Sequence, residues 1–408
     1  MRILCVHQGY ELYGSDRSFV ESVAALREAW PDADIEVVLP RDGPIVAPLQ
    51  SVASRVRFAP IWVLRRRAIA RLATIGVLRL PVALWRAARA IAAADVVYVN
   101  TIVIIDYLIA ARFFPDRVLV HVHEIPERHA RKAFRALLRW SRAELIFNSQ
   151  ATRSAFDLPS STVQHVVYNA IAGPPHIAGL DYDGARPLRL LMIGRINRIK
   201  GQDLLIEALE SLPAAVTRRL DVRIVGGSFE NDSARENALH RQVQSANLQG
   251  IVRFEPFRPD PAPLYQWADV VVIPSRRPES LGRVAIEAMA HGRPAIAAAI
   301  GGLTEVVDHG VSGWLVPPND PARLADAIAQ AVAEPQSWRT YSSAARARWQ
   351  AVFGERATRQ IQALVRATAA RRAAAQAATR MDADPGSGMW SPRTNGTSRD
   401  KSDMDSGA

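Results

Sequence analysis

Cysteine is almost absent from this chain of 408 residues, which contains only Cys5. A single cysteine excludes an internal disulfide framework and a zinc site built from cysteines. Cys5 lies in the apolar run Arg2–Val6, where a small core residue is a simpler interpretation than a nucleophile. The same run is too short for a secretory signal, so we expect a cytoplasmic protein.

Long hydrophobic runs are also missing. The longest candidate, residues 96–114, contains Asn100, Thr101 and Asp106, which make it an unconvincing membrane span. Apolar residues make up 49% of the chain and charged residues 22%, an ordinary balance for a globular protein. Because the chain is too long for one ordinary core, we expect two domains.

Acidic residues are absent from residues 43–94, a stretch rich in arginine. Its arginines are Arg55, Arg57, Arg65, Arg66, Arg67, Arg71, Arg79, Arg86 and Arg89. The pattern predicts two basic amphipathic helices broken near Pro81, with Trp62 and Trp85 suited to a membrane interface. Each arginine near anionic headgroups would contribute about 1 kcal/mol. The alternative interpretation is a solvated arginine-rich face packed on the first domain.

A net charge of +11 attracts anionic partners, either a membrane surface or nucleic acid. The chain shows no basic motif with interleaved aromatic residues, so we expect no nucleic-acid partner. The arginine-rich stretch instead suggests peripheral contact with the inner face of the plasma membrane.

Lysine is rare, since the 51 basic residues include only Lys132, Lys200 and Lys401. Residues 188–209 predict a strand, a loop with Gly194 and Gly201 at its corners, and a helix. Such a loop cradles phosphate, and Arg195 and Lys200 could neutralise a diphosphate there. Where arginine is the usual cation, a lysine suggests a compact point charge. The alternative is surface cations beside a turn.

Two carboxylates stand out in residues 268–294. A buried strand, residues 268–273, precedes a loop containing Glu279 and then an apolar helix that begins near Ser280 or Gly282. Glu287 interrupts that helix and must find hydrogen-bond donors or face a wet cleft. Glu279 lies at the carboxyl end of the strand, where open α/β sheets bind ligands. The alternatives are that Glu279 complements a helix N-terminus and that Glu287 is solvated.

These motifs together resemble a known family. Gly194-Arg195 with Lys200-Gly201, followed by Glu279-x7-Glu287, resembles the retaining family-4 glycosyltransferases of GT-B fold. Gly301-Gly-Leu-Thr-Glu305 and Asn319-Asp320 resemble later signatures of the same family. The resemblance covers about residues 1–345 and is most specific in the carboxyl half. It implies an α/β fold with two Rossmann-like β/α/β domains facing a central cleft and a C-terminal helix that crosses back.

The alternation of strands and helices implies mainly parallel sheets. We expect an acceptor-side domain at 1–171, a Gly- and Pro-rich linker at 172–187, a nucleotide-sugar-binding domain at 188–345, crossover helices at 346–370 and a mostly disordered tail at 371–408. Within that tail, the Arg- and Ala-rich residues 371–380 either extend the last helix or fray. The first strand is followed by a glycine loop and a helix from about Ser15 to Trp30, with Ser15 or Asp16 as its cap.

The resemblance implies transfer of a sugar from a nucleotide diphosphate-sugar to a sugar, lipid-linked or other hydroxyl acceptor, with retained configuration. It further implies a place in cell-surface polysaccharide or glycolipid synthesis. Arg195 and Lys200 would offset the charge that grows on the departing diphosphate. Glu287 would bind the ribose hydroxyls.

Further positions follow from the same resemblance. Glu279, with the N–H groups of Leu281 and Gly282, would hold the donor sugar, and His123 would face that sugar from the first domain. His121, deeper in the same strand, fits a hydrogen-bonded core histidine. The remaining donor-binding positions are Gly14, Gly194, Gly226 and Phe257.

We expect no metal and no cofactor. The motif Asp181-Tyr-Asp183 lies in the linker, so cations and helix N-termini would take the place of a metal. No enzymic nucleophile is evident, which fits a front-face mechanism in which the leaving phosphate helps to deprotonate the acceptor. Two alternatives stay open besides nucleic-acid binding: a nucleotide-sugar epimerase of the same fold and a non-catalytic sugar-nucleotide binding protein.

Overall fold

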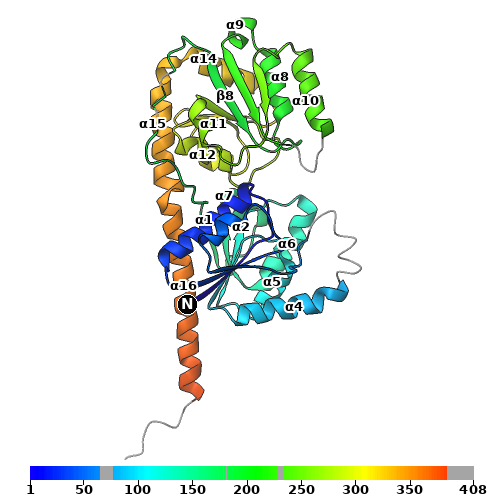
Figure 1. Cartoon of the computed structure of the whole chain (residues 1–408), viewed down its shortest axis with the longest axis vertical. Coiled ribbons are helices and arrows are strands. Elements are labelled where there is room, and N and C mark those ends of the chain that lie inside the picture. The colour runs from blue at the N-terminus through cyan, green and yellow to red at the C-terminus, as the bar shows by residue number, and fades with distance from the viewer. Residues whose placement is uncertain (65–76, 178, 181, 228–232, 384–408) are drawn as a thin grey trace, which may run out of the picture.

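The computed structural model describes residues 1–64, 77–177, 179–180, 182–227 and 233–383. These residues form two α/β domains stacked along the long axis of the molecule, with the last helices running beside both (Figure 1). The expected fold class, two Rossmann-like domains with parallel sheets, is confirmed.

The first domain contains a parallel sheet with strand order β3-β2-β1-β4-β5-β6-β7. Its strands are β1 (Arg2–Val6), β2 (Asp34–Leu39), β3 (Arg55–Phe58), β4 (Val96–Val99), β5 (Val118–Val122), β6 (Glu144–Phe147) and β7 (Gln164–Val166). Its helices are α1 (Gly14–Ala29), α2 (Val46–Gln50), α4 (Val77–Ala92), α5 (Ile105–Ala111), α6 (Arg128–Ser141) and α7 (Gln150–Phe156). The central strands β1, β4 and β5 are mostly apolar and buried, as expected where helices cover both faces of a sheet.

The second domain repeats this plan with strand order β10-β9-β8-β11-β12-β13. Its strands are β8 (Leu188–Ile193), β9 (Leu220–Val225), β10 (Val252–Glu255), β11 (Val270–Ile273), β12 (Ala295–Ala298) and β13 (Gly313–Val316). Its helices are α8 (Gln202–Ser211), α9 (Ala214–Thr217), α10 (Ser233–Ser245), α11 (Ala262–Trp267), α12 (Arg283–Ala290), α13 (Leu303–Val306), α14 (Pro321–Ala333) and α15 (Trp338–Arg348). In each domain the order reverses beside the first strand, β1 or β8, where such sheets bind ligands.

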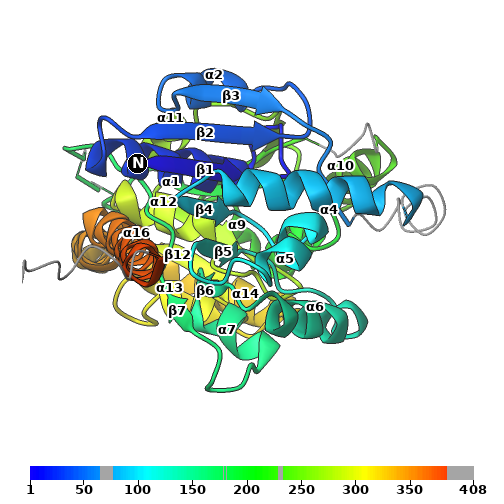
Figure 2. The same ribbon diagram turned by 90° about the horizontal axis from the view of Figure 1, so that it is seen from below.

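The carboxyl-terminal helices return to the first domain. After η4 (Pro335–Ser337) and α15, a π-helical turn, η5 (Trp349–Phe353), leads into α16 (Glu355–Ala383). Ile361 and Val365 of α16 are buried in the same core as α1, and seen from below α16 lies on the side of the sheet opposite α4 and α5 (Figure 2). The expected crossover is therefore present.

Residues 371–383 continue α16, the first of the two alternatives for the stretch 371–380, because it is rich in alanine and arginine, which favour helix. Two other local predictions are wrong. Helix α4 continues through Pro81, which lies near the beginning of the described helix and removes at most one hydrogen bond there. The other expected basic helix falls mainly on residues 65–76, and the end of the tail on 384–408, both outside the described residues.

The second wrong prediction concerns the start of α1. The helix begins at Gly14 with Tyr13 as its N-cap, and Asp16 is its third residue. The Asp16 carboxylate accepts hydrogen bonds from the Tyr13 N–H at 3.1 Å and pairs with His7 at 2.8 Å. Asp16 therefore joins the end of β1 to the start of α1. Among the described helices, none is both long and apolar enough to cross a membrane.

Candidate functional site

A cavity of about 310 Å³ lies between the two domains. The first domain contributes residues at the start of α1, and the second contributes the loops that follow β8, β9, β10 and β11. Most of the predicted site residues line it: Gly14, Gly194, Arg195, Lys200, Gly226, Phe257, Glu279 and Glu287. Residues more than 270 positions apart in the chain thus meet in one place, as a two-domain ligand site requires.

Glycines allow the loops of the second domain to approach one another. Gly201 has φ +78° and caps α8, and a Cβ there would lie 2.1 Å from the Pro274 carbonyl oxygen. A Cβ on Gly226 would lie 2.0 Å from the Gly194 carbonyl oxygen. Any side chain at either position would push apart the loops that line the cavity.

Lys200 and Glu279 form an ion pair inside the cavity. The Lys200 Nζ lies 2.7 Å from the Glu279 Oε1, and the Ser275 hydroxyl donates to the same oxygen. Burial alone would raise the pKa of the Glu279 carboxyl, but the charge of Lys200 and hydrogen bonds from Lys200 and Ser275 outweigh burial and lower it. Glu279 is therefore ionised at neutral pH.

The backbone at Glu279 is fixed by the Gly301-Gly302 pair. The Gly302 N–H donates to the Glu279 carbonyl at 2.8 Å, and Glu279 bridges to Gly301 in parallel. A Cβ on Gly302 would lie 2.5 Å from the Leu281 Cα. The Gly301-Gly302 pair thus fixes the position of the loop that carries Glu279.

Glu287 is held by two side chains. Its Oε1 accepts from the Arg283 Nε and its Oε2 from the Tyr265 hydroxyl, both at 2.7 Å. Arg283 also donates from both terminal nitrogens to Glu21 of α1, each at 2.7 Å, and to the Ser18 hydroxyl at 3.0 Å. Burial alone would lower the pKa of Arg283, but Glu21 and Glu287 outweigh burial and raise it. Arg283 therefore joins the two domains at the wall of the cavity.

Sequence reasoning missed Arg283. Its position four residues before Glu287 on one helix face was an available signal, because side chains at this spacing interact. No local pattern indicated Glu21, which lies 262 positions away in the chain.

Arg195, from the second domain, reaches across the cavity to contact the first domain. Its guanidinium lies 4.0 Å from the centroid of the Tyr13 ring and 3.4 Å from the Glu11 carboxylate, both in the first domain. The Tyr13 and Phe257 rings lie 5.3 Å apart, so an aromatic pair closes one side of the cavity. Sequence reasoning also missed Tyr13, because its contacts are with Arg195 and Phe257 of the other domain.

Three predicted site residues do not line this cavity. Leu281 is 2% exposed, and Gly282 is the N-cap of α12, where a Cβ would lie 2.4 Å from the Leu303 side chain. His123 belongs to a separate buried cluster at the end of β5.

That cluster joins the carboxyl ends of β1, β4 and β5. The Asn100 side chain accepts from or donates to two rings, with Oδ1 2.8 Å from the His123 Nε2 and Nδ2 3.2 Å from the His7 Nδ1. The His121 and His123 ring centroids lie 4.0 Å apart with their planes tilted by 39°, and the His121 Nδ1 hydrogen-bonds the Tyr98 hydroxyl. Burial, with smaller contributions from neighbouring His121, His7 and Arg283, lowers the pKa of His123 well below its ordinary value. His123 is therefore neutral.

Direct contacts also join the loops of the two domains. The Ser149 hydroxyl at the end of β6 donates to the Ser280 carbonyl, and Glu305 accepts from the N–H groups of Gln150 and Ala151 at 2.8 and 2.7 Å. Among the residues that the structure describes, no group of three or more His, Cys, Asp or Glu side chains is arranged to hold a metal.

Two parallel-sheet domains that enclose such a cavity define the GT-B class of fold. Residues 184–348 match the family described as "Glycosyl transferases group 1". The matched residues comprise the second domain of this chain.

The curated relatives include D-inositol 3-phosphate glycosyltransferases. That of Frankia alni is 42% identical over 185 residues, which is 44% of each chain. That of Thermobispora bispora is 38% identical over 174 residues, 41% of this chain and 40% of the relative. The match thus spans less than half of these relatives.

Solved structures match over both domains. Anabaena HepE in complex with UDP is 25% identical with a TM-score of 0.72, covering 90% of this chain and 99% of that one. A further HepE structure, with the same scores and coverage, is in complex with UDP-glucose. A Rickettsia africae glycosyltransferase, 18% identical with a TM-score of 0.69, covers 91% of this chain and 98% of its own and shares the fold.

Proposed function

We propose that this protein is a retaining glycosyltransferase that moves a sugar from a nucleotide diphosphate-sugar to an acceptor hydroxyl. The observation that carries the proposal is the convergence of Arg195, Lys200, Glu279 and Glu287 in one interdomain cavity bounded by glycine loops. The HepE complexes with UDP and UDP-glucose support a uridine donor as the first to test.

The departing diphosphate would be bound by Lys200 and Arg195. In the present structure Lys200 is paired with Glu279, and its side chain is 27% exposed toward the cavity. A diphosphate carries more charge than one carboxylate, so it would share Lys200 with Glu279 and gain the Arg195 fork. These cations stabilise charge where it develops on bond cleavage, a role that requires no metal. We therefore propose metal-independent transfer.

The nucleoside and sugar would lie on either side of this diphosphate. Glu287 accepts one hydrogen bond on each oxygen from Arg283 and Tyr265, which leaves lone pairs free for ribose hydroxyl donors. Phe257, 42% exposed, offers an aromatic surface beside the base. Glu279 would accept hydrogen bonds from the sugar hydroxyls. Arg283 is a positioning residue, because it fixes Glu287 through its own contacts with Glu21.

The acceptor would approach from the first domain. His123 is neutral and hydrogen-bonded to Asn100, which suits an uncharged hydroxyl group. Retention without an enzymic nucleophile requires that the leaving phosphate deprotonate the acceptor on the same face. The family match covers residues 184–348 of the second domain, and the curated relatives match less than half of this chain, so the inositol phosphate in their names does not identify the acceptor. A role in cell-surface polysaccharide or glycolipid synthesis at the inner membrane face completes the proposal.

The first test is thermal stabilisation of the full chain by UDP-, GDP- and ADP-sugars, with and without a chelator. We expect stabilisation by one diphosphate family in both conditions and its loss in Glu287→Ala. Release of the nucleotide that depends on an acceptor would establish transfer. Conversion of the donor without any acceptor would instead support the epimerase, and stabilisation without turnover a binding protein. No stabilisation by any donor would overturn the proposal.

A further inference from the structure

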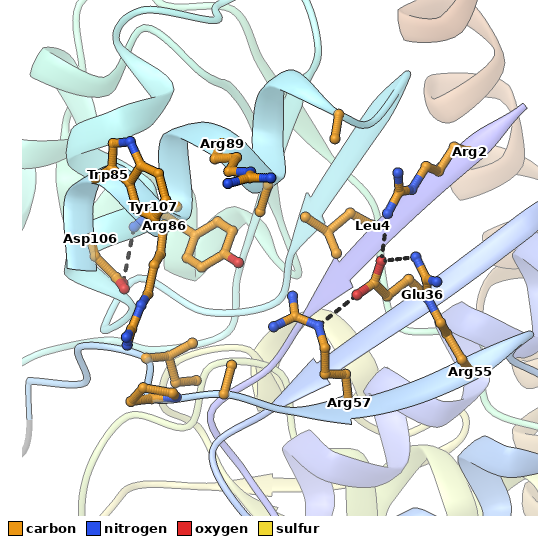
Figure 3. Close-up of a pocket in the computed structure, with 16 residues that line it drawn as sticks. Arg2, Leu4, Glu36, Arg55, Arg57, Trp85, Arg86, Arg89, Asp106 and Tyr107 are labelled. Atoms are coloured by element: carbon orange, nitrogen blue, oxygen red, sulfur yellow. Dashed lines mark hydrogen bonds and ion pairs between the residues drawn. The ribbon is translucent and has the colours of Figure 1, made fainter. Parts of the chain in front are cut away.

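A second cavity, of about 450 Å³, lies within the first domain and shares no residue with the interdomain cavity. It is enclosed by β1, β2 and β3 on one side and by α4, the start of α5 and residues 59–61 on the other (Figure 3). We call it the arginine hollow. Its volume is within the range of small-molecule sites.

Strand register explains why charged side chains point into this space. Leu4 pairs with Glu36 and Glu36 with Arg55, so the three share one face of the parallel sheet. Arg57, two residues after Arg55, lies on the same face. Helix α4 faces them with Ala87 and Ala90, which are too small to fill the space. A sheet face that would ordinarily be apolar under a helix is thus basic and open.

The charge of the hollow is positive. Five arginines line it against two carboxylates, Glu36 and Asp106. Glu36 accepts hydrogen bonds from Arg2, Arg55 and Arg57 at 3.0, 2.6 and 2.7 Å, so its one charge is opposed by three.

The second carboxylate is bound by backbone groups and makes no ion pair with an arginine among the described residues. Asp106 accepts from the backbone N–H groups of Trp62 and Tyr107, and burial raises its pKa to about 6 despite these bonds, so it stays mostly ionised at neutral pH. Arg86 and Arg89 have no carboxylate partner among the described residues.

Apolar surface adjoins this charge. Trp85 is 59% exposed beside the hollow, with the Arg89 guanidinium 5.4 Å from its ring centroid. Ile61 and Tyr107 continue the apolar wall. In Figure 3, Arg57 lies between the Glu36 cluster and the α4 side chains Trp85 and Arg86. An anion bound here would have guanidinium groups on several sides and an aromatic surface next to it.

We propose that the arginine hollow binds a phosphate ester that carries an apolar group, with Arg57, Arg86 and Arg89 around the phosphate and Trp85 beside the apolar group. Guanidinium forks match phosphate oxygens in geometry and charge. The ester would come either from an anionic phospholipid or from a soluble metabolite. The site is independent of the donor site and does not require that the chain transfer a sugar.

The test uses the full chain and short-chain dihexanoyl phosphatidic acid below its micelle concentration, measured by titration calorimetry. Dihexanoyl phosphatidylcholine and inorganic phosphate are the comparison probes. We expect saturable binding of phosphatidic acid, with both comparison probes at least about tenfold weaker. Absence of saturable binding, or inorganic phosphate binding as tightly as phosphatidic acid, would overturn the proposal.

Variants on α4 separate the hollow from general surface charge. The double variant Arg86→Gln/Arg89→Gln should bind phosphatidic acid at least about tenfold more weakly. The matched control is Arg79→Gln, an exposed arginine of the same helix that does not line the hollow. Equal losses in the control and in the double variant would contradict a defined site. Trp85→Ala should weaken phosphatidic acid but not inorganic phosphate.

Vesicle sedimentation then distinguishes the two sources of the ester. Co-sedimentation with phosphatidylcholine vesicles that contain phosphatidic acid, lost in the double variant and kept in Arg79→Gln, would identify a membrane lipid. Binding of the short-chain probe without co-sedimentation would identify a soluble ester. Because these side chains are exposed, all variants should retain wild-type thermal unfolding, and their stabilisation by nucleotide should be unchanged.

Discussion

The two sheet edges that meet across the interdomain cavity differ in kind. The edge of the second domain carries ionised side chains in ion pairs that open to the cavity, such as Lys200 with Glu279. The edge of the first domain carries His7, Asn100 and His123, which are buried and hydrogen-bonded to one another. The same topology thus presents ion pairs that open to the cavity at one edge and a buried hydrogen-bonded polar cluster at the other. In the proposed function, the diphosphate binds at the edge of the second domain and the acceptor hydroxyl approaches from the first.

The largest effect should come from removing the cation of the charged edge. Lys200→Ala should lower turnover by about 100-fold or more, because a preorganised charge stabilises the departing diphosphate. Stability should fall by only about 1 kcal/mol, since the ion pair with Glu279 is partly exposed. Steady-state kinetics and urea unfolding measure the two quantities. Arg198→Ala, an exposed cation of the same loop, is the control, and equal proportional losses of activity and stability would refute the assignment.

Replacing Arg283, which joins the two domains, should lower both the stability of the protein and its affinity for the donor. Arg283→Met leaves Glu21 and Glu287 without their shared partner, a loss of about 3 kcal/mol for a mostly buried pair. The KM for the donor should rise more than kcat falls, because Glu287 loses its orientation. Arg283→Lys, which keeps the charge without the fork, should recover part of the stability. An unchanged KM in both variants would remove Arg283 from the donor site.

The glycine corner of the charged edge provides a third test. Gly201→Ala places a Cβ against the Pro274 carbonyl at a positive φ and should destabilise the protein by about 2 kcal/mol. Stabilisation by nucleotide should disappear as the loop moves. Gly250→Ala, where a Cβ would meet nothing within 4 Å, is the matched control. Thermal unfolding with and without nucleotide measures both effects. Equal stability and equal nucleotide stabilisation in Gly201→Ala and Gly250→Ala would contradict the prediction.

The smallest effect concerns Glu36 and its arginine partners in the arginine hollow, away from the interdomain cavity. Burial alone would raise the pKa of Glu36, but hydrogen bonds from Arg57, Arg2 and Arg55 outweigh it and lower the pKa to about 2. Its folded pKa lies below the ordinary 4.5, so its stabilisation is complete above pH 4.5 and is lost as the pH falls toward 2. Because Arg55 and Arg57 are about half exposed, this contribution is about 1–2 kcal/mol.

The measurement is urea unfolding at pH 5 and pH 3. Glu36→Gln should be less stable than the wild type at pH 5, and the difference should shrink at pH 3. Glu28→Gln, at an exposed position of α1, should show no such pH-dependent difference. A constant difference between wild type and Glu36→Gln at both pH values would mean that the cluster stabilises by packing alone.

Local patterns predicted much of the second domain. The strand-loop-helix at 188–209 and the spacing of Glu279 and Glu287 predicted five residues that line the cavity, because each motif is contained within one βα unit: Gly194, Arg195, Lys200, Glu279 and Glu287. Of the two positions expected for the start of α12, Ser280 and Gly282, the second is its N-cap. The first domain was harder to interpret. The acid-free stretch indicated an anionic partner but not that Arg55 and Arg57 bind Glu36, since Glu36 lies on the neighbouring strand.

The sequence by itself determined the fold class, the glycine corners and the charged residues of the donor-side loops. These depend on periodicity and on short-range backbone geometry, which are written within a few consecutive residues. Only the tertiary structure decided that Arg283 binds Glu21, that Tyr13 faces Phe257 and that α4 leaves the arginine hollow open. Those contacts join elements that are distant in the chain, and packing of whole helices and sheets, not local pattern, sets their distances.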